Sequence, residues 1–247
     1  MTAPINSLRV AIVTGGTSGI GRETALRLAR DGFAVAVNFA SNKSAGDETV
    51  AELEATGAKA LAFQADVADE NAVMAMFEQV EQQFGGVDVL VNAAGIMPTV
   101  PLMDLDLTVL DRVLRTNIRG TFVVDQQAVK RLRTGGAIIN ISSSIVRFSR
   151  PGYTAYAASK GAVEAITLIL ARELRGRDVT VNTVAPGPMA TPLFFEGKSV
   201  EILERIRIEP PVERFGEPAD AAEAIAFLAG PGRWVNGQTI YVNGGAI

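Results

Sequence analysis

The chain has 247 residues, 48% of them hydrophobic, with a formal net charge of −4, no histidine and no cysteine. This length and apolar content are enough for one α/β domain with a substantial core. The missing residue types exclude a zinc hydrolase, a Ser-His triad and disulfides, and we expect no metal site. The mixed charge, without a basic stripe, argues against nucleic acid as a partner.

The amino-terminal residues 1–16 (MTAPINSLRVAIVTGG) run straight into a strand pattern. They contain neither the apolar core nor the cleavage site of a signal peptide. No apolar run approaches the roughly 20 residues that a membrane helix requires. We therefore expect a cytoplasmic protein with no membrane partner.

Short apolar runs alternate with amphipathic stretches along the chain. Runs such as VAIV, AVAV and VDVLV are apolar almost throughout, which is typical of strands covered on both faces. The alternation predicts a parallel sheet with helices on both faces, and only residues 186–216 interrupt it. The expected strands are residues 9–13, 34–38, 59–64, 87–92, 137–142, 180–185 and 239–242. The expected helices are residues 19–31, 45–56, 70–84, 105–133, 155–175, 200–208 and 219–229.

The first expected turn, between a strand and a helix, carries the sequence TGGTSGIG. In such a turn, backbone N–H groups and the helix N-terminus can bind a phosphate. The spacing of Gly15, Gly19 and Gly21 differs from the usual GxGxxG pattern. Gly16 and Gly21 have the spacing of a Walker P-loop, but Arg22 stands where the P-loop lysine is required, which argues against an NTPase. The turn therefore predicts a cofactor with phosphate groups, and the alternative is a tight turn without a ligand.

Tyr156 and Lys160 stand four residues apart in a stretch, AYAASKGAVEAITLILAREL, that has the pattern of a helix. At this spacing they share one helix face, with Cβ atoms about 5–6 Å apart. A free phenol has a pKa of about 10, and a nearby ammonium group lowers it. In a chain without histidine or cysteine this pair is a leading candidate for acid–base chemistry, and Ser143 could hydrogen-bond a substrate oxygen. The alternative is a surface tyrosine and a solvated lysine on an ordinary helix.

The chain carries, in order, TGxxxGIG at residues 14–21, NAAG at 92–95, Asn117, Ser143, and Tyr156 with Lys160, followed by Pro186-Gly187 and VNGG at 242–245. Together these motifs resemble the short-chain dehydrogenase/reductase family over essentially the whole chain. The group that contains the 3-oxoacyl-[acyl-carrier-protein] reductases is the most similar. The resemblance implies a single-domain α/β Rossmann fold over residues 1–247, with a doubly wound, seven-stranded parallel sheet and helices on both faces.

The resemblance also implies catalytic roles. Tyr156 would be the general acid in reduction and the base in oxidation, while hydride moves directly between nicotinamide C4 and the carbonyl carbon. Lys160 would lower the pKa of Tyr156 and hold the nicotinamide ribose, and Ser143 would orient the substrate carbonyl. Asn117 would support a water-linked proton path through Lys160, or would be a packing residue. Serines flank Ser143 on both sides, and its thirteen-residue spacing to Tyr156 favours it over them.

Cofactor contacts follow from the same resemblance. Asp66, at the end of the third expected strand, would contact the adenine ring, and the alternative is a helix cap before Asp69. The expected cofactor-binding residues are Gly15, Thr17, Ser18, Gly19, Ile20, Gly21, Asn38, Ser41, Asp66, Val67, Asn92, Ala93, Gly95, Tyr156, Lys160, Pro186, Gly187, Met189 and Thr191.

The end of the second expected strand distinguishes NADP from NAD. An acidic residue there would bind the ribose 2′-OH and repel a 2′-phosphate. Residues 37–43 (VNFASNK) contain no acid, and Ser41, Asn42 and Lys43 could accept the phosphate. This favours NADP(H). NAD(H) remains the alternative, because Ser18 stands where many NADP-binding relatives carry a basic residue.

The substrate is less defined. The resemblance makes residues 188–216 a substrate lid, in which Met189, Leu193, Phe194 and Phe195 suggest an apolar wall. Arg147 and Arg150, before Tyr156, could hold an anionic group or be ordinary exposed arginines. A second arginine group could meet an acidic carrier protein, or form solvated helix faces paired with Glu164 and Glu173. Its members are Arg131, Arg133, Arg172, Arg175 and Arg177.

Family members are commonly tetramers built on two long helices and the C-terminal strand, so we expect a homotetramer. The favoured function is an NADP(H)-dependent reductase or dehydrogenase that acts on a small-molecule carbonyl or secondary alcohol, such as a ketone or 3-oxoacyl compound. One alternative is an NAD-dependent dehydrogenase of a sugar, steroid or small alcohol. Another is a dinucleotide-binding regulator that has lost catalysis.

Overall fold

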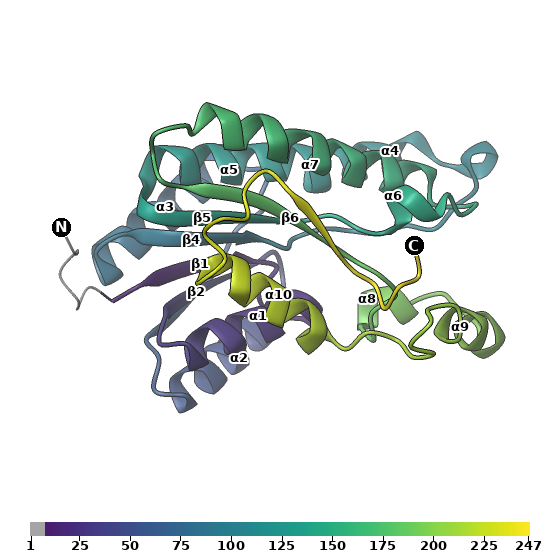
Figure 1. Cartoon of the computed structure of the whole chain (residues 1–247), viewed down its shortest axis with the longest axis horizontal. Coiled ribbons are helices and arrows are strands. Elements are labelled where there is room, and N and C mark those ends of the chain that lie inside the picture. Colours follow the sequence, from purple (N-terminus) through teal and green to yellow (C-terminus); the bar gives the residue numbers. More distant parts are fainter. Residues whose placement is uncertain (1–7) are drawn as a thin grey trace.

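A seven-stranded parallel sheet forms the centre of the computed structural model, which describes residues 8–247 (Figure 1). The strands are β1 (Val10–Thr14), β2 (Ala34–Phe39), β3 (Ala60–Gln64), β4 (Val87–Asn92), β5 (Leu132–Ile141), β6 (Thr180–Pro186) and β7 (Thr239–Val242). Their order across the sheet is β3-β2-β1-β4-β5-β6-β7, and every neighbouring pair is parallel. The strand order reverses between the neighbouring strands β1 and β4. Their carboxyl ends therefore form the switch point of a doubly wound sheet.

Helices cover both faces of the sheet (Figure 1). The helices are α1 (Gly19–Arg30), α2 (Lys43–Ala55), α3 (Glu70–Phe84), α4 (Leu107–Val113), α5 (Gly120–Arg131), α6 (Ile145–Phe148), α7 (Thr154–Glu173), α8 (Pro192–Phe195), α9 (Val200–Arg207) and α10 (Pro218–Ala229), with a 3-10 turn η1 (Leu102–Asp104) and a π-helical turn η2 (Leu114–Arg119). Helices α1, α2 and α10 lie on one face, and α3, α5 and α7 lie on the other. None of the helices within residues 8–247 combines the length and apolar character that crossing a membrane requires.

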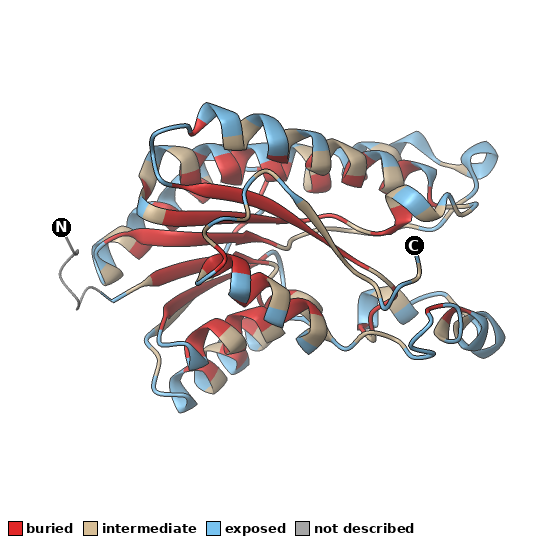
Figure 2. Ribbon diagram, viewed as in Figure 1, coloured by how far each residue is buried: buried red, intermediate tan, exposed pale blue. Residues whose placement is uncertain are grey.

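The alternation along each strand divides the core into two layers. In β1, Ala11 and Val13 pack with α1 and α10, whereas Val10 and Ile12 pack with α3 and α5. All residues of β1, β2, β4 and β6 are buried, as Figure 2 shows by the red sheet between the helices. This confirms the doubly covered parallel sheet.

The long helix expected at residues 105–133 is wrong in two respects. The structure divides it into α4, the π-helical turn η2 and α5, and β5 already begins at Leu132. Apolar periodicity does not reveal a π turn, which adds a residue without removing the apolar face. The early start of β5 depends on pairing of Leu132 with Val87, after which the register shifts.

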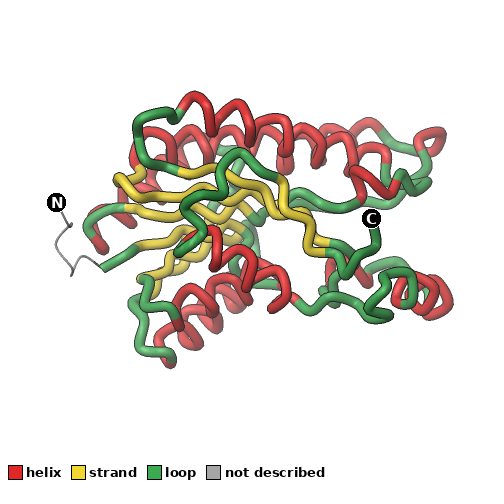
Figure 3. Tube along the Cα trace, in the orientation of Figure 1, coloured by secondary structure: helices red, strands yellow, loops and turns green. Residues whose placement is uncertain are grey.

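Residues 188–216 form a separate small layer beyond the carboxyl edge of the sheet, visible in Figure 3 as two short helices on green loops. Pairing of Met189 with Gly216 closes its base. The helix expected at residues 200–208 is α9, whereas α8 was not expected. Phe194, Phe195 and Phe215 pack edge-on, with ring centroids 5.4–6.0 Å apart, so these phenylalanines bind the segment to itself.

Candidate active site

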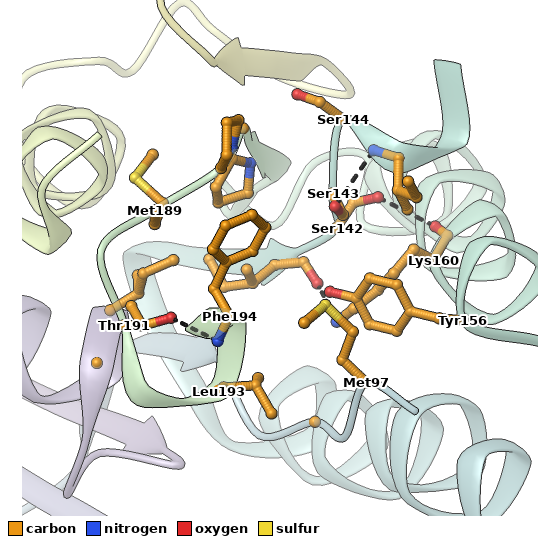
Figure 4. Close-up of a pocket in the computed structure, with 18 of the residues that line it drawn as sticks. Met97, Ser142, Ser143, Ser144, Tyr156, Lys160, Met189, Thr191, Leu193 and Phe194 are labelled. Atoms are coloured by element: carbon orange, nitrogen blue, oxygen red, sulfur yellow. Dashed lines mark hydrogen bonds between the residues drawn. The ribbon is translucent and has the colours of Figure 1, made fainter. Parts of the chain in front are cut away.

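A pocket of about 230 Å³ lies at the carboxyl ends of β1, β4, β5 and β6 (Figure 4). Open α/β sheets bind ligands at this edge, beside the switch point. The pocket runs from the glycine turn after β1, past the ends of β4 and β5, to α7 and α8. The lining includes most of the residues expected to act in catalysis or cofactor binding: Gly15, Ser18, Gly19, Ile20, Gly21, Ala93, Gly95, Ser143, Tyr156, Lys160, Pro186, Gly187, Met189 and Thr191.

Tyr156 and Lys160 are buried one turn apart on α7 and face the pocket together with Ser143 (Figure 4). The Ser143 hydroxyl interacts with the Tyr156 hydroxyl. The two flanking serines are turned elsewhere. Ser142 Oγ donates to Glu164 Oε1 at 2.9 Å, with the Lys160 carbonyl as a more distant acceptor at 3.2 Å, and Ser144 Oγ donates to the Ala185 carbonyl. Of the three consecutive serines, Ser143 is therefore the one beside Tyr156.

Burial determines the protonation of both side chains. It raises the pKa of Tyr156 to about 12, against the opposing effect of Ser143, and it lowers the pKa of Lys160 to about 8. Burial outweighs any lowering of the Tyr156 pKa in this structure, and Lys160 is not among the groups that shift it. Lys160 Nζ donates to the Ile141 carbonyl at 2.7 Å and lies 5.8 Å from the Tyr156 ring centroid, so the ammonium meets the ring face. At neutral pH Tyr156 is thus a protonated phenol, ready to donate its proton.

Asn117 is buried within η2 and joins three parts of the site. Its Oδ1 accepts from the Ile96 N–H at 2.9 Å, and its Nδ2 donates to the Ile96 carbonyl at 2.9 Å and to Ser159 Oγ at 3.0 Å. A Cβ on Gly95 would lie 3.3 Å from Asn117 Oδ1 and 3.5 Å from Lys160 Nζ. Asn117 therefore has the packing function expected as an alternative, and it also lies near the ammonium group.

The glycine turn fits the phosphate groups of a dinucleotide. A Cβ on Gly21 would lie 2.3 Å from the Gly15 carbonyl oxygen, and a Cβ on Gly15 would meet Ala94 at 3.0 Å, so the turn closes tightly against the end of β4. Gly19, the first residue of α1, lines the pocket with φ +49°, a left-handed conformation that favours glycine. Ser18, the N-cap of α1, makes no side-chain capping bond, which leaves the first N–H groups of the helix for an anion.

Several expected cofactor residues lie outside the pocket lining. Asn38 is buried, and its Nδ2 donates to the Ala65 carbonyl at 2.9 Å, which ties β2 to the end of β3. Asn92 Oδ1 accepts from Thr14 Oγ1 at 2.9 Å. These polar side chains hold the sheet edge together. The residues outside the lining are Thr17, Asn38, Ser41, Asp66, Val67 and Asn92, and the catalytic candidate Asn117.

Asp66 does not cap α3. That position belongs to Asp69, whose carboxylate accepts from the N–H groups of Asn71 and Ala72. Asp66 instead accepts from the Ala68 N–H at 2.9 Å and pairs with Arg115 at 2.8 Å. Burial alone raises the pKa of this carboxyl, but these two partners outweigh burial and hold the pKa below its ordinary value.

The segment after β2 is exposed and partly occupied by local contacts. Ser41 is exposed, Asn42 Oδ1 caps α2 through the Ala45 N–H at 3.1 Å, and Lys43 pairs with Asp47 at 2.7 Å. No acidic side chain stands at the end of the strand itself. The observation that favours NADP(H), the lack of an acidic residue at the end of β2, therefore still holds.

The expected pairing of the second arginine group with Glu164 and Glu173 is wrong, and three of its members have other partners. Arg131 pairs with Glu78 and Glu81 on α3, and Arg133 pairs with Asp88 at the start of β4. Arg177 donates to backbone carbonyls, including that of Val129. These arginines tie secondary-structure elements together, and none of them pairs with Glu164 or Glu173.

Sequence analysis did not single out several pocket residues, among them Met97, Tyr153 and Ile206. Tyr153 lies three residues before Tyr156 and could have been found by helical spacing, since such residues share a face. Met97 and Ile206 come from a loop and from α9, whose approach to the pocket depends on the tertiary fold.

Known proteins with similar sequences and folds identify the family of this chain. A family model described as enoyl-(acyl carrier protein) reductase matches residues 15–246. An NADPH-dependent aldehyde reductase-like protein of Arabidopsis thaliana is 44% identical, over 97% of this chain and 94% of its own length. The 3-oxoacyl-[acyl-carrier-protein] reductase FabG of Staphylococcus aureus is 42% identical, over 95% and 96%. A short chain dehydrogenase from Burkholderia cenocepacia, crystallised in complex with NADP, has a TM-score of 0.91 at 39% identity, over 98% and 99% of the two chains. The chain therefore belongs to the short-chain dehydrogenase/reductase family of NAD(P)-dependent oxidoreductases.

Proposed function

We propose that this protein is an NADP(H)-dependent reductase that transfers hydride between the nicotinamide and a ketone, 3-oxoacyl or similar carbonyl compound. The observation that carries the proposal is the placement of Ser143, Tyr156 and Lys160 in one pocket with the glycine turn. The relatives named as NADPH-dependent or solved with NADP support the same cofactor.

The nicotinamide would supply the hydride, and the chain would supply the proton. Tyr156, protonated at neutral pH, donates its proton to the carbonyl oxygen. Ser143 hydrogen-bonds the same oxygen and fixes its position beside the phenol. As the phenol loses its proton, the ammonium of Lys160 stabilises the resulting phenolate. Asn117 positions the Gly95 segment beside Lys160 and supports the path by which the proton is replaced.

The glycine turn and the N-terminus of α1 would hold the cofactor phosphates, since the turn fits a closely approaching anion. Asp66 and Val67 would contact the adenine end, and Pro186, Met189 and Thr191 the nicotinamide end. The absence of an acid after β2 favours NADP(H) over the alternative, NAD(H).

The chain would act as one catalytic domain with residues 188–216 as its lid, since Met189, Leu193 and Phe194 line the outer pocket. We further propose a cytoplasmic homotetramer. Phe122 on α5 and Leu168 and Ile169 on α7 are 46–59% exposed, which fits helices that pack against a second copy.

The test is oxidation of NADPH by a panel of ketones, 3-oxoesters and diketones, beside the same panel with NADH. We expect turnover with a higher kcat/KM for NADPH. Tyr156→Phe should lower kcat by about 10²- to 10⁴-fold while NADPH binding stays nearly intact, because only the proton donor is lost. A fully active Tyr156→Phe variant refutes the mechanism. Tight NADPH binding without turnover of any compound favours the non-catalytic regulator.

A further inference from the structure

The outer pocket has a marked imbalance of charge. Its lining is largely apolar and includes Met97, Phe148, Leu193, Phe194 and Ile206. Within the described residues, only two charged side chains line the pocket, and both are cations: Lys160 and Arg150. No carboxylate is part of the lining. The charge of the lining therefore suits an anionic group on the substrate.

The surroundings of Arg150 hold its guanidinium in place. The side chain is 25% exposed, and its Cζ lies 4.9 Å from the Phe148 ring centroid. Burial lowers the pKa of Arg150, and the nearby charge of Arg205 adds to this effect against the influence of Tyr153. The group nonetheless remains charged, because a guanidinium does not lose its proton in proteins. A partly desolvated cation stacked on a ring interacts strongly with an anion that reaches it.

Arg150 already has one partner, but its hydrogen-bonding capacity is not used up. Its Nη2 donates to Glu209, which follows α9 and is 41% exposed. A guanidinium has five N–H donors in a planar fork, and this is the single hydrogen bond from the Arg150 side chain within residues 8–247. A second carboxylate can therefore bind without displacing Glu209, and the neighbouring Arg205 offsets the added negative charge.

Arg147, in the same loop, provides a natural comparison. It is exposed, its Nε donates to the Tyr241 hydroxyl at 3.0 Å, and it does not line the pocket. Only one of the two loop arginines can thus meet a substrate whose carbonyl lies at Ser143 and Tyr156.

We propose that Arg150 is a substrate-specificity residue and that the pocket takes oxo acids: compounds with a carbonyl for Tyr156, an apolar body, and a carboxylate that Arg150 binds. This inference rests on the proposed reductase function and names its substrate class. Glu209 reduces the preference for oxo acids over neutral carbonyl compounds, because it partly neutralises the Arg150 guanidinium.

The test compares a graded series of straight-chain oxo acids with their methyl esters, so that each pair differs by one charge and one methyl group. In the wild type, kcat/KM with NADPH should be higher for at least one acid than for its ester. Arg150→Met, which keeps the apolar stem beside Phe148, should lower kcat/KM for that acid by about 10- to 100-fold, as expected for loss of hydrogen bonds to a charged group. The esters should change by less than about threefold. Arg147→Met should change neither, and Glu209→Gln should raise kcat/KM for the acid.

Two other results would overturn the inference. An equal loss for acids and esters in Arg150→Met would make the Arg150–Glu209 pair a structural latch of the lid. Equal turnover of acids and esters by the wild type would remove the specificity altogether. Calorimetric titration of the oxo acid into the NADP-loaded wild type and Arg150→Met separates this inference from the proposed function. Weaker binding to the variant supports the role of Arg150 even if no carbonyl is reduced, whereas ester turnover without acid preference retains the reductase and refutes the role.

Discussion

Asp125 is a buried acid that no step of the proposed reaction uses. It lies on α5, and Asn140 on β5 donates to its Oδ2 at 3.0 Å. Asp125 Oδ1 and Asn140 Oδ1 are both buried acceptors without a hydrogen-bond partner in residues 8–247. A proton on the carboxyl would convert one of these acceptors into a donor. Burial raises the pKa of Asp125 to about 7, against the opposing effect of the neighbouring Asn140 and Asn92 side chains.

The raised pKa has a defined effect on stability. The unfolded chain releases this proton near pH 3.9, roughly three units below the folded protein, and each unit corresponds to about 1.36 kcal/mol. Between about pH 4 and pH 7 the folded state holds a proton that the unfolded state has lost. The protonated carboxyl therefore contributes up to roughly 4 kcal/mol below pH 4. This contribution is lost as the pH rises through about 7.

Asp125→Asn removes the titratable carboxyl and keeps the shape of the side chain. The new amide N–H can donate to Asn140 Oδ1. We expect the free energy of unfolding of the variant, minus that of the wild type, to rise by about 3 kcal/mol between about pH 5 and pH 8. Urea unfolding at a series of pH values measures this difference, and Asp111→Asn, at an exposed position on α4, is the matched control. A difference that is constant with pH, or that falls as the pH rises, refutes a raised pKa for Asp125.

Three further predictions concern the site. Gly21→Ala should weaken NADPH binding by about tenfold or more, because its Cβ would lie 2.3 Å from the Gly15 carbonyl oxygen. Gly161→Ala, whose Cβ would meet no atom within 4 Å, is the control. Equal affinities of the two variants for NADPH would contradict the binding of the cofactor phosphates at the glycine turn. Ser41→Asp, at an exposed position after β2, should lower the NADPH-to-NADH ratio of kcat/KM by about tenfold through repulsion of a 2′-phosphate, and an unchanged ratio would place the phosphate elsewhere. Because burial lowers the pKa of Lys160 to about 8, kcat for reduction should fall roughly tenfold per unit above that pH as the ammonium is lost, and a flat profile up to about pH 10 would exclude this role.

The sequence by itself determined the parts that depend on local pattern. Apolar runs such as residues 10–14 had to be strands covered on both sides, and their alternation with helices led to one parallel sheet. The spacing of Tyr156 and Lys160 placed both on one helix face, and the glycine turn indicated an anion site at the start of α1. These signals need only neighbours within a few residues.

The tertiary structure decided what depends on distant contacts. The π-helical turn at Asn117 accompanies bonds to Ile96, 21 residues away, and Asp66 binds Arg115, 49 residues away. The upward pKa shift of Tyr156 comes from burial, which no local spacing encodes. The same holds for Arg150, which sequence analysis grouped with Arg147 until the fold turned only Arg150 into the pocket. Chemistry follows residue type, but protonation and access follow from the packing around each side chain.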